Sequence, residues 1–275
     1  MGKIILIISL SVLAFLLLSC SLFLLLIKPN KKRTEMERFK GVKYAHRGLH
    51  GKGCAENSLA AFEKAISMGY GIELDIRLSR DGELVVFHDS TLDRVTKEKG
   101  RVIEKSAEEL GKIRLLDTDD TIPTFEEVLS LVSGRVPLLV EIKEDEGGTS
   151  VAKAAVEVLK KYEGDFIVES FNPLALAYFK KHMPEAMRGF LSQNFLKQKK
   201  YRKLLYFLLQ NMLLNSVSRP DFISYNHQDH KNFPLKLMRY IFKATTICWT
   251  VRSKEEETKA YENGFDGIIF ENYKA

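Results

Sequence analysis

The chain has 275 residues and a formal net charge of +6. This length can bury one large core, as in a single α/β barrel, or the cores of two smaller domains. Residues 1–40 hold seven Lys or Arg and two Glu, so the remaining chain has a net charge of only +1. A nucleic-acid-binding surface is therefore not expected. Three scattered cysteines, Cys20, Cys54 and Cys248, have no spacing typical of a metal site or a disulfide framework.

The first predicted element is an uncharged apolar segment of 24 residues, from Ile4 to Ile27. As a helix, at ~1.5 Å per residue, it exceeds the ~30 Å thickness of the hydrocarbon core of a bilayer. A cleaved secretory signal has only about 7–15 apolar residues before a small-residue cleavage site. We therefore expect residues 1–33 to form a single-pass transmembrane anchor with a basic linker, followed by one domain over residues 34–275.

Basic residues that follow the apolar segment predict a lipid contact and an orientation. Lys28, Lys31, Lys32 and Arg33 suit anionic headgroups, and they outnumber Lys3 on the other side of the segment. By the positive-inside rule, this excess of basic residues favours a cytoplasmic location for the folded domain of this predicted membrane protein.

Short apolar runs alternate with helical patterns along the rest of the chain. The predicted strands cover 42–48, 71–78, 83–89, 137–143, 166–171, 187–192, 221–226, 245–251 and 265–270. Helices with N-capping residues or a terminal glycine are predicted over 58–69, 124–133, 150–164 and 254–264. This alternation predicts an α/β fold with a parallel sheet, and its closed form is the TIM-type (β/α)8 barrel.

Nine predicted strands are one more than such a barrel contains. Asp81-Gly82 separates the runs 72–80 and 83–89, and this dipeptide predicts a two-residue β-hairpin. In that register Asp75 faces His88. The apolar side of the hairpin then consists of Ile76, Leu78, Val85 and Phe87. The alternative is two adjacent parallel strands without a helix between them, which brings His88 to the same rim.

Polar residues stand at the ends of several predicted strands, and in a barrel these ends meet at one mouth. Three carboxylates, Glu73, Asp75 and Glu141, form an oxygen-rich set of the kind that Mg²⁺ or Ca²⁺ prefers. Two imidazoles, His46 and His88, suit acid–base chemistry near neutral pH.

Two cations and one aromatic residue complete the predicted site. Arg47 and Lys143 suit phosphate oxygens, while Trp249 belongs either to the core or to an aromatic wall of a ligand site. Taken singly, each of these polar residues has an ordinary structural interpretation, such as a surface ion pair. Their coincidence at one end of apolar strands favours a functional site.

These residues and their order resemble the glycerophosphodiester phosphodiesterase family. The motifs are "AHRG", "ENSLAAFEKAISMGYGIELDIRLSRDGELVVFHDSTLDRVT", "EIK", "SFNP" and "WTV", and the resemblance extends from about Lys43 to Phe270. It implies a TIM-type barrel that uses a divalent metal to hydrolyse glycerophosphodiesters to an alcohol and glycerol phosphate.

The resemblance also implies a role for each predicted site residue. His46 and His88 would be the acid–base pair. The metal ligands would be Glu73, Asp75 and Glu141, and the phosphate contacts would be Arg47 and Lys143. Glu56 would lie beside the site, where it either has a direct role in substrate binding or orders the first strand–helix loop.

Two positions at the mouth differ from the family pattern. Arg252 follows "WTV", where Asn is frequent, and Phe270-Glu271-Asn272 stands where "TD" with a nearby proline is usual. Contacts to the glycerol or to the leaving alcohol are therefore expected to differ.

The segment 197–217 has a basic start followed by apolar residues from Leu204 to Leu214. It is either a barrel helix that buries its apolar face or a second membrane contact. The latter would favour lysophospholipase D-like activity on lysolipids over small glycerophosphodiesters. A membrane-tethered module that binds phosphodiesters without catalysis is the remaining alternative. The sequence predicts no oligomeric state.

Overall fold

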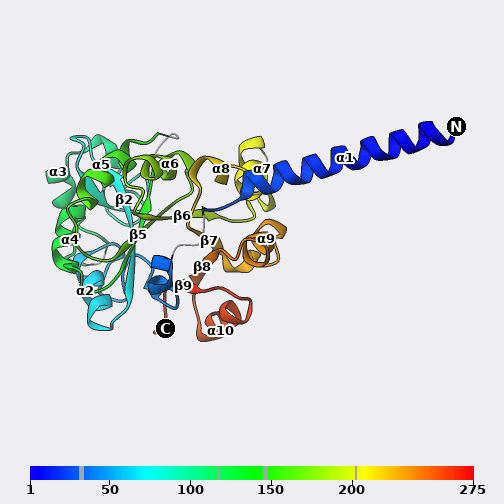
Figure 1. Ribbon diagram of the computed structural model, residues 1–275. Coiled ribbons are helices and arrows are strands. Elements are labelled where there is room, and N and C mark those ends of the chain that lie inside the picture. Colours follow the sequence, from blue (N-terminus) through cyan, green and yellow to red (C-terminus); the bar gives the residue numbers. More distant parts are fainter. Residues whose placement is uncertain (31–33, 117, 145–147, 202) are drawn as a thin grey trace.

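Eight parallel strands close into a barrel in the computed structural model, which describes residues 1–30, 34–116, 118–144, 148–201 and 203–275 (Figure 1). The strands are β1 (Lys43–Ala45), β2 (Gly71–Leu78), β4 (Leu138–Ile142), β5 (Phe166–Ser170), β6 (Met187–Ser192), β7 (Phe222–Asn226), β8 (Thr245–Val251) and β9 (Gly267–Phe270). Pairing of β1 with both β9 and β2 closes the ring. The predicted TIM-type barrel is confirmed, and each of the nine predicted strands overlaps an observed one.

Helices cover the outside of the barrel. They are α2 (Leu59–Ser67), α3 (Ala107–Gly111), α4 (Phe125–Val132), α5 (Ser150–Leu159), α6 (Pro173–His182), α7 (Leu204–Gln210), α8 (Asn215–Ser218), α9 (Phe233–Tyr240) and α10 (Lys254–Glu262). Short 3-10 turns are η1 (Thr34–Phe39), η2 (Val102–Glu104), η3 (Phe195–Lys197), η4 (Lys199–Tyr201) and η5 (His227–Asp229). The helix starts follow from their caps, since Ser58 accepts from the Ala61 amide and Thr124 forms a capping box with Glu127.

The interior of the barrel is closed at the amino ends of its strands by η1. Met36 and Phe39 are almost fully buried there against Tyr44 and the inward-facing residues of the other strands. A polar site inside the barrel is therefore confined to the opposite end, where the strands finish.

The ninth strand, β3 (Leu84–Val86), pairs antiparallel with β2 outside the barrel, which confirms the hairpin but corrects its register. Arg80, Asp81 and Gly82 form a three-residue loop, because the Ser79 amide donates to the carbonyl of Glu83. A two-residue turn of the predicted type needs positive φ at both central residues, and here Gly82 alone of the pair has it (φ 84°).

The one-residue shift moves Asp75 opposite Phe87 rather than His88, since the Phe87 amide donates to the Asp75 carbonyl at 2.9 Å. The predicted apolar side is thus wrong. Ile76 and Leu78 pair with Val86 and Leu84. Val85 and Phe87 point the other way, into a small core shared with Leu92, Val102, Leu110, Leu115 and Ile122.

The helix α1 (Gly2–Ile27) is long and apolar enough to cross a membrane, and most of it projects from the body (Figure 1). Its last turn is embedded. Ile27 is fully buried, the Arg219 guanidinium donates to the carbonyls of Leu25 (3.0 Å) and Lys28 (2.7 Å), and the Asn215 amide donates to that of Ile27 (2.9 Å). Two side chains of the barrel domain therefore satisfy carbonyls that a helix end leaves open. Of the predicted basic linker, 31–33 (Lys31, Lys32 and Arg33) lies outside the described residues.

The inward-facing Gly189 in β6 generates a stability prediction. An added Cβ would overlap the ring of Phe222, which is fully buried. We expect Gly189→Ala to lower the free energy of unfolding by ~1–3 kcal/mol through overpacking. Urea unfolding of the full chain in detergent, followed by Trp249 fluorescence, measures it. Gly111→Ala is the control, because the nearest atom to its added Cβ is at 3.9 Å; equal losses for both variants would contradict the prediction.

Candidate active site

A tight turn after β1 brings His46 and Arg47 to the mouth of the barrel. Arg47 and Gly48 have positive φ (55° and 77°), and a Cβ on Gly48 would lie 2.8 Å from the Cβ of Ala61. Glycine is therefore required where this turn passes α2. The turn is held by the Arg47 amide, which donates to Oε2 of Glu73 at 2.9 Å.

Three carboxylates form a buried acidic nest, which we define as Glu73 and Asp75 of β2 and Glu141 of β4. Their exposed fractions are 2%, 0% and 7%, and their ligand oxygens lie within 4.8 Å of one another. The β2–β4 register places Asp75 beside Glu141, so both point inward from one layer of the barrel. The sequence prediction that these acids gather is confirmed.

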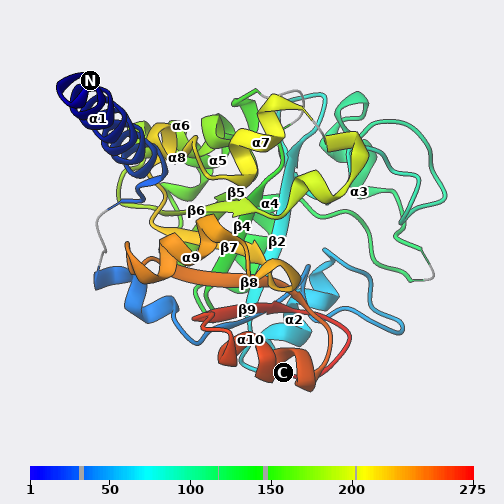
Figure 2. The ribbon, with the colours of Figure 1, turned by 90° about the vertical axis from the view of Figure 1, so that its right-hand side faces the viewer.

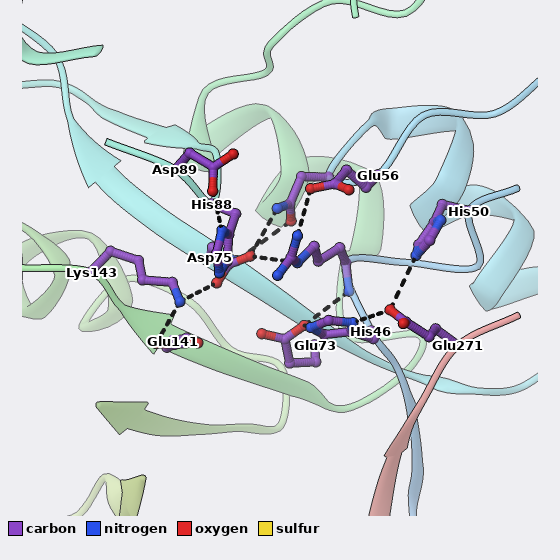
Figure 3. Close-up of polar contacts among 12 residues, drawn as sticks. His46, His50, Glu56, Glu73, Asp75, His88, Asp89, Glu141, Lys143 and Glu271 are labelled. Atoms are coloured by element: carbon purple, nitrogen blue, oxygen red, sulfur yellow. Dashed lines mark hydrogen bonds and ion pairs between the residues drawn. The ribbon is translucent and has the colours of Figure 1, made fainter. Parts of the chain in front are cut away.

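Two cations lie against the acidic nest (Figure 3). The Lys143 ammonium is 3.1 Å from Asp75 and 2.7 Å from Glu141, and the Arg47 Nε is 3.4 Å from Asp75. The Asn57 amide also donates to Asp75 at 2.9 Å. Burial opposes ionisation of Asp75, but Lys143, His88 and Arg47 outweigh it and hold its pKa well below the usual range.

The acidic nest fits a divalent cation on electrostatic grounds. Burial raises the pKa of Glu73 well above its usual value, and the charges of Asp75 and Glu141 raise it further. Glu169 of β5 stands next to Glu141 in the same layer, is 1% exposed, and also has a strongly raised pKa, first because of burial. When ionised, these four carboxylates exceed the two cations by two charges. A hard dication with oxygen ligands would relieve that repulsion.

Each predicted catalytic histidine is held by a carboxylate on Nδ1 (Figure 3). For His46 the partner is Glu271, at 2.5 Å, and for His88 it is Asp89, at 2.6 Å. A carboxylate only accepts hydrogen bonds, so this contact keeps the proton on Nδ1 and leaves the lone pair on Nε2. The Nε2 of His46 lies 4.0 Å from Glu73.

Burial favours the neutral form of both imidazoles. Burial lowers the pKa of His46, although the bond to Glu271 offsets part of this. Burial likewise lowers the pKa of His88 to about 4 against the opposing charge of Asp75. A neutral imidazole with a free Nε2 is the form that can accept a proton.

Glu56 belongs to a network of ion pairs beside the nest. It accepts from Arg47 (Nη1, 2.7 Å) and from Arg94 (Nη2, 2.6 Å), and Arg94 also donates to Asp89 at 2.5 Å. Burial alone would raise the pKa of Glu56, but Arg94 and Arg47 lower it to about 2. This geometry favours the interpretation in which Glu56 orders the loop, since it holds Arg47 and, through Arg94, the partner of His88.

Trp249 belongs to β8 and is partly buried. Its ring meets Phe171 edge-on at 5.8 Å between centroids, and it packs against the inner core of the barrel. These contacts agree with the core interpretation, and a role in the wall of a ligand site stays a prediction.

The sequence assigned no role to several residues of the site, among them Asn57, Glu169 and Glu271. Glu169 had a usable signal, because it is an acid within an apolar strand, as Glu141 is. Glu271 was recognised only as a departure from the family pattern. Its role depends on the fold, since β9 lies beside β1 and so brings Glu271 to His46 across 225 positions of the chain.

Comparison with known proteins agrees with this geometry. The model of the "Glycerophosphoryl diester phosphodiesterase family" matches residues 46–275. A glycerophosphodiester phosphodiesterase of Caldanaerobacter subterraneus subsp. tengcongensis is 32% identical over 239 residues, which cover 82% of this chain and 91% of that protein.

Solved structures show the same similarity. An Oleispira antarctica phosphodiesterase in complex with the product sn-glycerol-3-phosphate aligns with a TM-score of 0.69 at 25% identity, covering 85% of this chain and 94% of that one. A Thermotoga maritima glycerophosphodiester phosphodiesterase aligns with a TM-score of 0.65 at 29% identity, covering 84% and 94%.

The depressed pKa of Glu56 generates a pH-dependent prediction. Its ionised form stabilises the fold at pH values above its ordinary pKa of 4.5, and this stabilisation is lost as the pH falls towards 2. We expect Glu56→Gln to lower the free energy of unfolding at pH 7 by ~1–3 kcal/mol, and we expect the deficit to shrink by pH 3. Urea unfolding at both pH values measures this.

The matched control for that experiment is Glu126→Gln. Glu126 is exposed in the first turn of α4, so its neutralisation should change stability by less than ~0.5 kcal/mol. A deficit for Glu56→Gln that stayed constant with pH would contradict the ion-pair explanation.

Proposed function

The chain belongs to the glycerophosphoryl diester phosphodiesterase family and is a phosphoric diester hydrolase; from this premise we propose that it works with one divalent cation and two histidines. The observation that carries the proposal is the pair of carboxylate-held imidazoles, His46 and His88, which flank the buried acidic nest. A module that only binds phosphodiesters would not need two histidines held in this way.

Glu73, Asp75 and Glu141 would hold the cation, and their all-oxygen chemistry favours Mg²⁺ or Ca²⁺. When bound, such an ion polarises a phosphate oxygen and lowers the pKa of an oxygen nucleophile. Arg47 and Lys143 stand beside the nest as the groups that would bind the remaining phosphate oxygens.

Two proton transfers are required to hydrolyse a phosphodiester, and the two imidazoles supply one each. One neutral imidazole accepts the proton of the attacking oxygen on Nε2. The other first takes a proton from solvent on Nε2 and, as the imidazolium, delivers it to the leaving alcohol, while the first returns its proton to solvent. Glu271 and Asp89 fix the ring orientations, and each carboxylate stabilises the imidazolium that forms when its histidine is protonated.

We also propose that residues 1–33 are a retained membrane anchor and residues 34–275 the catalytic domain. The embedded last turn of α1 supports retention, because removal of α1 would leave the Arg219 and Asn215 contacts unmade. The basic residues after α1 support a cytoplasmic catalytic domain.

A second candidate substrate class is a lysolipid, cleaved by lysophospholipase D-like action. A row of aromatic rings supports it: Trp249 contacts Phe171, Phe171 contacts Phe195 at 6.0 Å, and Phe195 contacts Tyr206 of α7 at 5.5 Å between centroids. Such a row suits an acyl chain. Choline release from glycerophosphocholine and from lysophosphatidylcholine distinguishes the two classes.

We predict that His46→Ala or His88→Ala lowers kcat on the preferred choline ester by at least ~10²-fold, the usual scale of acid–base catalysis. His182→Ala is the control, because His182 stacks on Tyr178 at the end of α6, away from the mouth. Thermal unfolding of each variant verifies the fold. Near wild-type turnover in either active-site variant would contradict the two-histidine scheme.

We further predict that EDTA abolishes activity and that Mg²⁺ or Ca²⁺ restores it. The same ion should raise the Tm of the full chain, since it relieves the repulsion within the acidic nest and binds only the folded state. In Glu141→Gln the rise should shrink. Full turnover in EDTA, together with a Tm that neither Mg²⁺ nor Ca²⁺ changes, would contradict the proposed role of the cation.

A further inference from the structure

Charge is unevenly distributed within residues 41–275, which we call the body, although their net charge is close to zero. Residues 193–244 contain ten Lys or Arg and two Asp, a net charge of +8, whereas residues 41–275 together carry only +1. The rest of the body therefore carries −7. Both acids of the basic segment, Asp221 and Asp229, are buried, while seven of its lysines are exposed. These lysines are Lys197, Lys199, Lys200, Lys203, Lys231, Lys236 and Lys243.

Large apolar side chains stand exposed among these lysines. In α7, Leu204 is 74% exposed, Leu205 54% and Phe207 47%, and Leu209 is the residue of this helix that is buried. The α7 segment is therefore not a barrel helix that hides its apolar side. At the ends of α9 the exposed large apolar residues are Phe233, Tyr240 and Ile241.

Both helices lie on the side of the body from which α1 leaves. Figure 1 shows α7 and α9 on this side, and Figure 2, which looks straight at it, shows both in front with α1 directed towards the viewer. The acidic helix α10, with three glutamates in its first turn, lies beyond α9 and away from α1 in both views. It marks the border of the basic region.

The length of α1 indicates where the surface of the bilayer would lie relative to this side of the folded domain. Twenty residues, from Ile4 to Phe23, span ~30 Å as a helix, which matches the hydrocarbon core. Phe23 and Leu24 are the first residues of α1 that pack against the body. The polar joint of Arg219 and Asn215 fixes the helix there, so the adjoining surface meets the headgroup level.

We infer that the exposed apolar and basic side chains of η4, α7 and α9, which we call the membrane face, form a second contact with an anionic bilayer. Apolar side chains enter the boundary between headgroups and acyl chains while lysines bind the anionic headgroups, as in interfacial helices. The inference rests on the proposed anchor. It would fix the orientation of the barrel on the membrane and place Tyr206, the end of the aromatic row, beside the lipid.

The test uses the full chain in vesicles of phosphatidylcholine and phosphatidylglycerol. Cys54 and Cys248 are buried, so in a Cys20→Ser background a single new cysteine carries a polarity-sensitive fluorophore. With Leu205→Cys or Ile241→Cys we expect a blue-shifted emission that lipids with a nitroxide near the headgroup quench. Lys160→Cys follows α5, a helix that lies away from α7 and α9 in Figure 1, and with this probe we expect emission as in water.

Charge dependence is tested with the Leu205→Cys probe. Each lysine near an anionic surface favours docking by about fivefold, so Lys199→Gln/Lys200→Gln/Lys203→Gln should lower the docked-to-undocked ratio by about a hundredfold. Pure phosphatidylcholine should weaken quenching similarly. If the probes at 205 and 241 behave like the control while a label on native Cys20 is quenched, the membrane face is refuted and the anchor stands. If the label on Cys20 is not quenched, the anchor proposal fails and the membrane face with it.

Discussion

The repulsion among carboxylates inside the barrel is the constraint around which the mouth is organised. Glu73, Asp75, Glu141 and Glu169 are all nearly inaccessible to water, although ionised carboxylates are costly to bury without partners. Arg47 and Lys143 supply only part of the compensation. Apolar residues in these positions would often stabilise the barrel better, so this arrangement favours the proposed role of the acidic nest as a cation site.

The rest of the mouth follows from the same constraint. Arg47 is needed in the nest, and the tight turn with Gly48, the Asn57 amide and the Glu56 carboxylate all hold its loop in place. Arg94 connects that loop to Asp89 and so to His88. The acidic nest and one imidazole therefore belong to one network of hydrogen bonds and ion pairs, and a change at Glu56 is expected to affect both.

The barrel, its strands and the acidic nest could be predicted from the sequence. The evidence was the alternation of apolar and polar residues within strands, and of strands with helices along the chain. Alternation along β2 turned Glu73 and Asp75 to one side, and the rule that parallel strands end at one mouth brought Glu141 to them. The predicted register of the β2–β3 hairpin was wrong because the register depends on the φ angle of Asp81. The pattern of apolar residues does not determine that angle. Glu271 could not be given a role because its contact to His46 exists only once the barrel closes.

The sequence offered a membrane contact only as one of two alternatives for residues 197–217, and it gave no sign that α9 would share it. A net charge of +1 for the body suggested a neutral surface, yet it is the difference between +8 over residues 193–244 and −7 elsewhere, and only the fold gathers the former on the side of α1. This separation also bears on orientation. In the proposed cytoplasmic orientation, a basic face beside α1 would be stabilised by the anionic cytoplasmic leaflet, and the acidic remainder would be directed away from it. The folded surface thus supports the same orientation as the few charges that flank α1, and it does so with many more residues.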